Sequence, residues 1–175
     1  MDVDTDERWP YMYGMESHNS VIIDDGLFTP LRTWSAFAPK CRLVSSQSDD
    51  DSDVVEAEYQ VSGITHNRRI EFTKLSGLTV IDRFTGIPAS ELHGYTVLYH
   101  FDWGVDLNED KEGFVLSADD VNCRLCIEGP GAAESQITQD DKLAAIARQR
   151  PLPFVLTTTF QCKGETTIKS QFRWA

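Results

Sequence analysis

Alternation of apolar and polar residues dominates the chain and predicts β-strands rather than helices. In stretches such as 53–62 and 93–103, apolar, aromatic or β-branched residues recur at every second position, the spacing of one face of a strand. Turn-forming pairs such as Asp25-Gly26 and Ser76-Gly77 separate these stretches. The pattern predicts strands at 18–24, 31–37, 40–46, 53–62, 66–74, 77–84, 93–103, 112–118, 120–128, 152–162 and 165–174.

One segment departs from this alternation. Residues 138–150 begin with Thr138, a residue type that caps helices, carry acids early and arginines late, and end before Pro151. We expect one short helix here, with an irregular edge segment as the alternative. About eleven strands and at most one helix predict an all-β fold, a large antiparallel β-sandwich. We expect residues 15–175 to form it, after a lead-in segment at 1–14.

The composition is that of one globular domain. At 175 residues, with 41% hydrophobic and 10% aromatic residues, the chain is long enough to bury a core. Its formal net charge is −12, which repels nucleic acid and anionic membranes, so we expect neither as a partner. No apolar run is long enough to span a bilayer, and the acidic residues 1–14 do not read as a signal peptide.

The four cysteines do not form a recognisable metal or redox motif. Cys123 and Cys126 have C-x-x-C spacing but lie in a strand-like run, and strand positions three apart point to opposite faces. We therefore expect buried or half-buried free thiols.

The most aromatic strand allows two interpretations. Tyr95, Val97, Tyr99, Phe101 and Trp103 share one face if 93–103 is a strand. This face is either a stacking platform for sugar rings, which makes Tyr95 and Trp103 substrate-binding candidates, or the core wall of the sandwich. The aliphatic Val97 in the middle of the stripe favours the core wall.

Two histidines lie where predicted strands begin. His66 starts a face that continues with Arg68, Ile70 and Phe72, so it is either a hydrogen-bonded core residue or a metal ligand. His18 precedes an apolar strand, where a lone histidine is ordinarily a capped strand entrance. The chain contains no nucleophile elbow, phosphate loop or H-E-x-x-H sequence. Motif chemistry alone therefore predicts an all-β domain whose function stays open.

Four segments nevertheless occur together in a characteristic order. They are SHNSVIIDDG, THNRRIEFTKLSGLTVIDRFTG, HGYTVLYHFDWGVD and PLPFVLTTTF. In this order and spacing they resemble the C-terminal β-sandwich of the heparinase II/III-like polysaccharide lyases. That family typically shows a His-Asn-Thr/Ser-Val strand ending in Asp-Gly, then a His-x-Arg-Arg strand with a Val-Val-Asp hairpin, then a histidine-rich aromatic strand. The resemblance covers about residues 11–162.

The resemblance implies an antiparallel sandwich that follows an α/α toroid, expected upstream or in trans. Family members cleave uronic-acid glycans by β-elimination: a base removes the proton α to the carboxylate, and an acid, usually tyrosine, protonates the leaving oxygen. Most of this machinery belongs to the toroid, so the chain alone is not expected to be a complete lyase. The resemblance also implies an acidic or neutral polysaccharide as partner and an extracytoplasmic location, periplasmic or secreted.

Carried over by motif, the resemblance implies roles for single residues. His18 matches the histidine of the first signature strand, which lines the cleft and is the candidate catalytic residue. Relatives often read His-x-His on this strand, and the earlier histidine faces substrate. Here Glu16 occupies that position, so Glu16 and the nearby Tyr13 are substrate-binding candidates.

Several family members hold a structural zinc ion with histidines of the sandwich and an aspartate. His18 and His66 match those histidines, which implies a zinc site at these two residues. Residues 34–38, where the metal aspartate is expected, contain no aspartate, and Asp24 is the available substitute.

Two alternatives to a lyase domain stay open at this point. One is a non-catalytic carbohydrate-binding or protein-interaction sandwich with the same architecture. The other is a purely structural domain that binds no ligand.

Overall fold

The computed structural model describes residues 18–24, 40–61, 63–140 and 153–174. These residues form twelve strands and no helix. Every strand pair is antiparallel, which confirms the all-β antiparallel sandwich. The strands are β1 (Ser20–Ile23), β2 (Lys40–Ser48), β3 (Ser52–Val61), β4 (Ile64–Thr73), β5 (Gly77–Thr85), β6 (Leu92–His100), β7 (Asp106–Asp110), β8 (Gly113–Ala118), β9 (Val121–Glu128), β10 (Ala133–Gln139), β11 (Phe154–Lys163) and β12 (Thr166–Trp174).

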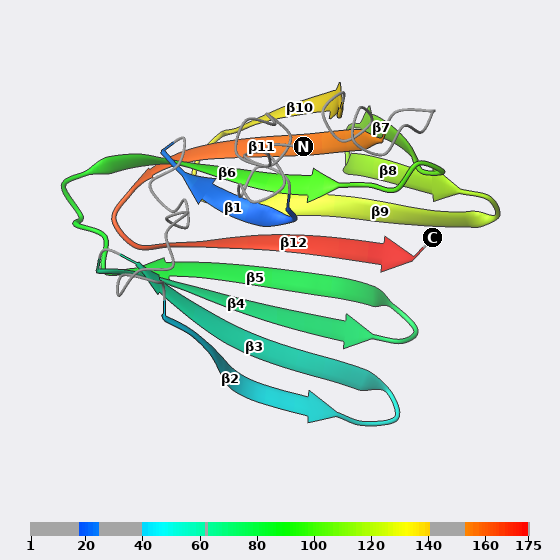
Figure 1. Cartoon of the computed structure of the whole chain (residues 1–175). Coiled ribbons are helices and arrows are strands. Elements are labelled where there is room, and N and C mark those ends of the chain that lie inside the picture. Colours follow the sequence, from blue (N-terminus) through cyan, green and yellow to red (C-terminus); the bar gives the residue numbers. More distant parts are fainter. Residues whose placement is uncertain (1–17, 25–39, 62, 141–152, 175) are drawn as a thin grey trace, which may run out of the picture.

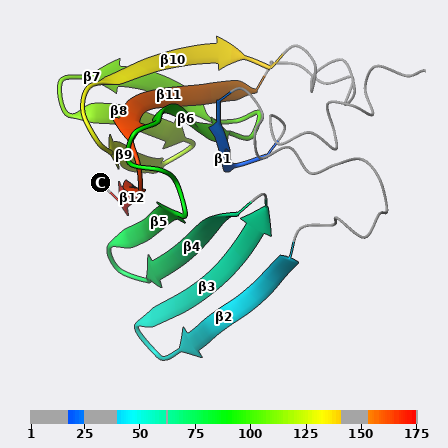
Figure 2. The same ribbon diagram turned by 90° about the vertical axis from the view of Figure 1, so that its left-hand side faces the viewer.

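Two sheets of unequal width make up the sandwich (Figure 1). The smaller sheet has the order β1-β6-β11-β10, and the larger one has the order β2-β3-β4-β5-β12-β9-β8-β7. Figure 2 shows that β2, β3 and β4 extend beyond the smaller sheet. Accordingly, apolar side chains on the inner face of this extension stay partly exposed, among them Val55 at 43% and Ile70 at 37%.

The expected strands differ from the observed ones in two places. The sequence pattern missed β7 and β10, which lie at the edges of the two sheets. The prediction of a helix at 138–150 is wrong for its first two residues. Thr138 and Gln139 belong to β10 and pair with Val155 and Phe154 of β11. The remainder of that helix, residues 141–150, and the strand expected at 31–37 lie outside the described residues.

The core lies between the smaller sheet and the β5–β12–β9–β8–β7 part of the larger sheet. The inward positions of β6 carry Tyr95, Val97 and Tyr99, with exposures of 0%, 0% and 5%. They face a cluster that includes Phe84 and Ile168 from the larger sheet. The aromatic stripe is therefore the core wall, as the position of Val97 favoured. In the part of the chain that the structure describes, no helix has the length and apolarity to cross a membrane.

The cysteines are free thiols in the described structure. Cys123 is buried, and Cys126 and Cys162 are half-buried, as expected. Cys41 is exposed, contrary to the expectation, because it lies on β2 at the edge of the larger sheet, where the smaller sheet does not reach.

Candidate functional site

The buried carboxylate of Asp82 is the centre of a polar cluster on the inner face of the larger sheet. Only 1% of Asp82 is exposed. Its Oδ1 accepts hydrogen bonds from Nε2 of His66 at 2.6 Å and from Nε of Arg68 at 2.7 Å. Its Oδ2 accepts another from Nη2 of Arg68 at 3.0 Å. Both donors lie on β4, where Arg68 directly opposes Asp82 in the strand register.

Charge pairing keeps this cluster ionised. Burial alone raises the pKa of Asp82, but the hydrogen bond from His66 and the charge of Arg68 outweigh it, so the pKa of Asp82 lies below its ordinary value. Burial likewise opposes the charge of Arg68, and the nearby carboxylate of Asp82 outweighs it, so the pKa of Arg68 is raised. At neutral pH, the buried carboxylate of Asp82 and the partly buried guanidinium of Arg68 therefore form an ion pair.

Arg68 connects this buried pair to the entrance of β1. Its Nη1 donates a hydrogen bond to the backbone carbonyl oxygen of Asn19 at 2.6 Å. The side-chain Oδ1 of Asn19 accepts a hydrogen bond from the backbone N–H of His100, at the end of β6, at 2.7 Å. Asn19 is thus tied to both sheets, and it directly follows the exposed His18. The cluster fixes the backbone from which His18 projects.

Two side chains of β6 add further polar groups near this corner. Tyr99 packs edge-on against Phe172 with a ring-centroid distance of 5.1 Å, and burial raises the pKa of Tyr99 to about 12. The phenol is therefore neutral at physiological pH. Nδ1 of His100 lies 3.4 Å from Oδ2 of Asp140, and both side chains are nearly buried.

A second histidine–aspartate pair closes the opposite end of β1. Asp24 has a left-handed backbone with φ of 45°. Its Oδ1 accepts a hydrogen bond from the N–H of Gly94 at 2.8 Å, and its Oδ2 accepts one from Nδ1 of His93 at 2.5 Å. Burial raises the pKa of Asp24, but the Gly94 and His93 hydrogen bonds outweigh it, so the pKa is lowered. These bonds attach the end of β1 to β6.

Asp24→Asn tests the strength of this attachment. Asparagine tolerates the left-handed backbone and still accepts the Gly94 hydrogen bond, so the substitution mainly removes the charge that faces His93. We expect the free energy of unfolding at neutral pH to fall by about 1–2 kcal/mol, measured by urea denaturation. Because the folded-state pKa is lowered, this stabilisation exists above the unfolded pKa of about 3.9 and is lost as the pH falls below it. The difference between the two proteins should therefore shrink in acid.

Asp119 provides a matched control for this substitution. It also has a left-handed backbone, with φ of 49°, but it lies exposed at the turn between β8 and β9. Asp119→Asn should leave the free energy of unfolding within about 0.5 kcal/mol of the parent. Equal losses for Asp24→Asn and Asp119→Asn would contradict a specific role for His93.

The candidate residues from the sequence lie in different settings. His18 is exposed at the entrance of β1, and Trp103 is half-buried in the loop after β6. Tyr95 is a correction: it has 0% exposure and its hydroxyl donates to the carbonyl oxygen of Gly164 at 3.2 Å, so it offers no surface to a substrate. Glu16 and Tyr13 lie outside the described residues.

One ring nitrogen of His66 is bonded to a carboxylate, an arrangement that metal-bound histidines also show. Its Nε2 is bonded to Asp82, and Arg68 occupies both oxygens of that carboxylate. In the described ranges, no group of three or more histidine, cysteine, aspartate or glutamate residues could hold a metal ion. These residues do not fit a zinc ion as they are placed. Zinc binding by His18 and His66 stays a prediction.

Sequence reasoning did not single out Asp82, Arg68 and Asn19 as one cluster. Each lies in a different part of the signature segments: Asn19 in HNSV, Arg68 in HNRR and Asp82 in the Val-Ile-Asp hairpin. The signal that could have found them was the recurrence of polar residues within apolar strand segments. Their pairing depends on the register of β4 against β5, which the sequence pattern does not specify.

A family model and several solved structures match this chain, and they point to the same family. A family model described as "Heparinase II/III-like, C-terminal" matches residues 3–171. A crystal structure of heparinase III superposes with a TM-score of 0.74 at 12% sequence identity, over 99% of this chain and 26% of that one. The crystal structure of a mutant heparan sulfate lyase from Pedobacter heparinus superposes with a TM-score of 0.70 at 11% sequence identity. The match covers 100% of this chain and 27% of that one. No curated protein sequence that was compared matches the chain. The chain spans about a quarter of the length of the solved structures it matches.

Proposed function

The chain belongs to the heparinase II/III-like C-terminal domain family, and from that membership we propose that it is the sandwich part of a polysaccharide lyase. The proposed reaction is β-elimination at uronic acids of an acidic polysaccharide. The chain supports and lines the substrate cleft, and an α/α toroid, fused upstream or supplied in trans, completes the catalytic site. The same resemblance supports an extracytoplasmic location for the protein.

The observation that carries this proposal is the convergence of separate signature segments at one corner. The HNSV, HNRR and Val-Ile-Asp segments meet through Arg68, which bonds both the buried Asp82 and the backbone of Asn19. A buried ion pair is weak support for stability by itself, but it can fix one local arrangement. Here it fixes the strand entrance that presents His18. An exposed imidazole on a rigid backbone is suited to receive or donate a proton at a cleft wall.

The residues that the structure describes do not present a complete set of groups for this reaction. β-Elimination needs a base for the proton α to the carboxylate, an acid for the leaving oxygen and a donor that neutralises the uronate. Tyr99, which precedes His100 at the end of β6, is 5% exposed and faces the core, so it does not reach a substrate. We therefore assign at most one wall of the site, with His18, to this chain.

Activity measurements on the chain with and without a toroid test the proposal. The chain alone, mixed with heparan sulfate or with unsulfated uronate polysaccharides, should give no increase in ultraviolet absorbance from unsaturated product. The full-length protein with its toroid, or the toroid added in trans, should give that increase. Robust turnover by the chain alone would overturn the division of labour. No turnover with the toroid on any uronate polysaccharide would overturn the lyase assignment.

His18→Ala in the complete enzyme tests the role of the strand entrance. Proton transfer by a positioned side chain contributes typically 10²–10⁴-fold, so we expect kcat to fall by about 10²-fold. KM should change less, because the imidazole acts in the transition state. His18 is exposed, so the unfolding midpoint of the variant should match that of the parent and serves as the control. Activity within about twofold of the parent would remove His18 from the site.

The alternative of a carbohydrate-binding sandwich has lost its main support. The proposed stacking platform required Tyr95 and Tyr99 at the surface, and both face the core with exposures of 0% and 5%. Trp103 is half-buried and does not form a platform by itself.

A further inference from the structure

The outer face of the larger sheet contains a hollow that lies on the opposite side of the sandwich from β1. It has a volume of about 570 Å³ and opens to solvent. It lies where β5, β12 and β9 meet the turns that follow β9 and β11. Its charged and hydroxyl-bearing lining residues include Arg83, Thr85, Glu128, Glu165, Thr167 and Lys169.

Two cations of this hollow, Arg83 and Lys169, lie on neighbouring strands and form no ion pair with another described residue. Arg83 on β5 directly opposes Thr167 on β12, and Lys169 is two residues further along β12. Side chains in such a diagonal relation on one face lie about 7–8 Å apart at their Cα positions, within reach of one ligand. Among the described residues, every ion pair of an arginine involves Arg42, Arg68, Arg69 or Arg124, and none involves Arg83 or Lys169. In a chain of net charge −12, the structure thus places two cations near each other on one face.

The rest of the lining offers hydrogen-bonding groups rather than apolar surface. Thr85 and Thr167 are exposed and supply hydroxyl groups. Glu128 opposes Lys169 in the register, and Glu165 accepts a hydrogen bond from the N–H of Gly86 at 3.1 Å. The carboxylates of Glu128 and Glu165 repel a small polyanion, so the hollow is unsuited to bind one. They can accept hydrogen bonds from sugar hydroxyls. Cations beside hydroxyl-accepting groups match a ligand that carries both a carboxylate or sulfate and free hydroxyls.

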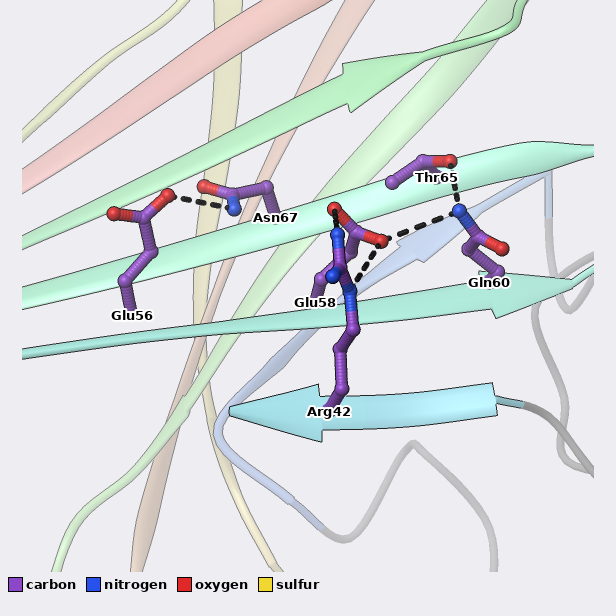
Figure 3. Close-up of polar contacts among 6 residues, drawn as sticks. All are labelled: Arg42, Glu56, Glu58, Gln60, Thr65 and Asn67. Atoms are coloured by element: carbon purple, nitrogen blue, oxygen red, sulfur yellow. Dashed lines mark hydrogen bonds and ion pairs between the residues drawn. The ribbon is translucent and has the colours of Figure 1, made fainter. Parts of the chain in front are cut away.

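The polar surface continues from this hollow across the extension of the sheet. Along one row of the register, Arg83 neighbours Asn67 on β4, Asn67 neighbours Glu58 on β3, and Glu58 neighbours Arg42 on β2. Figure 3 shows Arg42, Glu58 and Asn67 of this row on a common face, with Arg42 hydrogen-bonded to Glu58. Adjacent strands are about 4.8 Å apart, so the row from β12 to β2 is about 19 Å long, enough for several sugar rings.

We propose that this hollow, with the polar row beside it, is a second binding site for acidic polysaccharide, remote from the cleft at His18. Arg83 binds a uronate carboxylate or a sulfate, Lys169 adds a second charge contact, and the threonine and glutamate side chains bind the hydroxyls. The inference rests on the proposed function for its substrate class. Such a site would hold a long chain on the enzyme between successive cleavages.

Binding measurements with matched charge variants test this site. The probe is a size-defined heparan sulfate oligosaccharide, titrated into the isotope-labelled chain and followed by NMR and calorimetry. Arg83→Gln and Lys169→Gln should each raise Kd by about tenfold, since each removes a charged hydrogen bond. Arg173→Gln is the control: it lies on the same outer face at the far end of β12, is exposed, and removes the same charge. It should leave Kd within about twofold.

The alternative outcomes separate the site from the proposed function. Equal losses for Arg83→Gln and Arg173→Gln would overturn the site, because general charge then explains binding. Binding that survives Arg83→Gln but is lost in His18→Ala would also overturn it and leave the cleft assignment intact. Inorganic sulfate that binds as tightly as the oligosaccharide would overturn the sugar specificity. Absence of any oligosaccharide binding by the chain would overturn the site, whereas the lyase assignment would still be decided by the turnover assay.

Discussion

Asp82→Asn is expected to lower the free energy of unfolding by about 3–5 kcal/mol, the cost typical of removing one partner from a buried ion pair. Asparagine has nearly the shape of aspartate, so the loss comes from charge rather than from packing. Arg68 keeps a partly buried guanidinium without its carboxylate partner, and His66 loses its charged acceptor at 2.6 Å. Urea denaturation at neutral pH measures the effect, with an unchanged m-value as the criterion for a two-state comparison.

A double substitution and a pH series distinguish pairing from a general loss of structure. Arg68→Met together with Asp82→Asn removes both charges and should destabilise less than the sum of the single variants. Additive losses would contradict the pairing. The lowered folded-state pKa of Asp82 means that its contribution exists above about pH 3.9 and disappears as the pH falls through that lowered pKa. The parent should therefore approach the stability of Asp82→Asn in acid.

Strands with a buried face could be located from the sequence because burial imposes a period of two. The predicted strands 77–84 and 165–174 correspond closely to β5 and β12, which are neighbours in the larger sheet and turn every second residue toward the core. The two missed strands lack this signal. β7 contains a single apolar residue, Leu107, and β10 contains only Ala133 and Ile137. Both are edge strands, and each pairs with one neighbouring strand through its backbone. Backbone pairing of this kind does not require alternating apolar and polar residues, so the sequence pattern does not reveal it.

The candidate site could be predicted only in part for a related reason. His66 was correctly placed on a face that becomes core, and the alternative of a hydrogen-bonded core histidine is the one observed with Asp82. The partner itself was not predictable from spacing, since residues 66 and 82 meet only when β4 folds back on β5 in one register. The link from Arg68 to Asn19 joins residues 49 positions apart in different sheets. Contacts of this kind depend on the packing of the sandwich rather than on local pattern.

Phe84 lies between the apolar core and the polar cluster of Asp82, so we expect its substitution to have a large effect on the free energy of unfolding. Its ring is 0% exposed and stacks on the imidazole of His66 with a centroid distance of 4.4 Å and an interplanar angle of 16°. The Phe84 ring also packs against the ring of Tyr95, in a tilted arrangement with a centroid distance of 5.2 Å. The ring thus holds His66 in the orientation that allows the bond from Nε2 to Asp82. Apolar packing and polar geometry depend on the same side chain here.

Phe84→Ala should therefore lower the free energy of unfolding by about 3–5 kcal/mol, the usual cost of truncating a buried phenylalanine. Loss of the stacked ring should also shift and broaden the NMR resonances of the His66 imidazole, since its face then borders a cavity. Phe84→Leu is the control, because it fills most of the volume and should cost about half as much or less. A loss below about 1 kcal/mol for Phe84→Ala would contradict the packing described here. An unchanged His66 spectrum would show instead that Asp82 and Arg68 orient the imidazole without the ring.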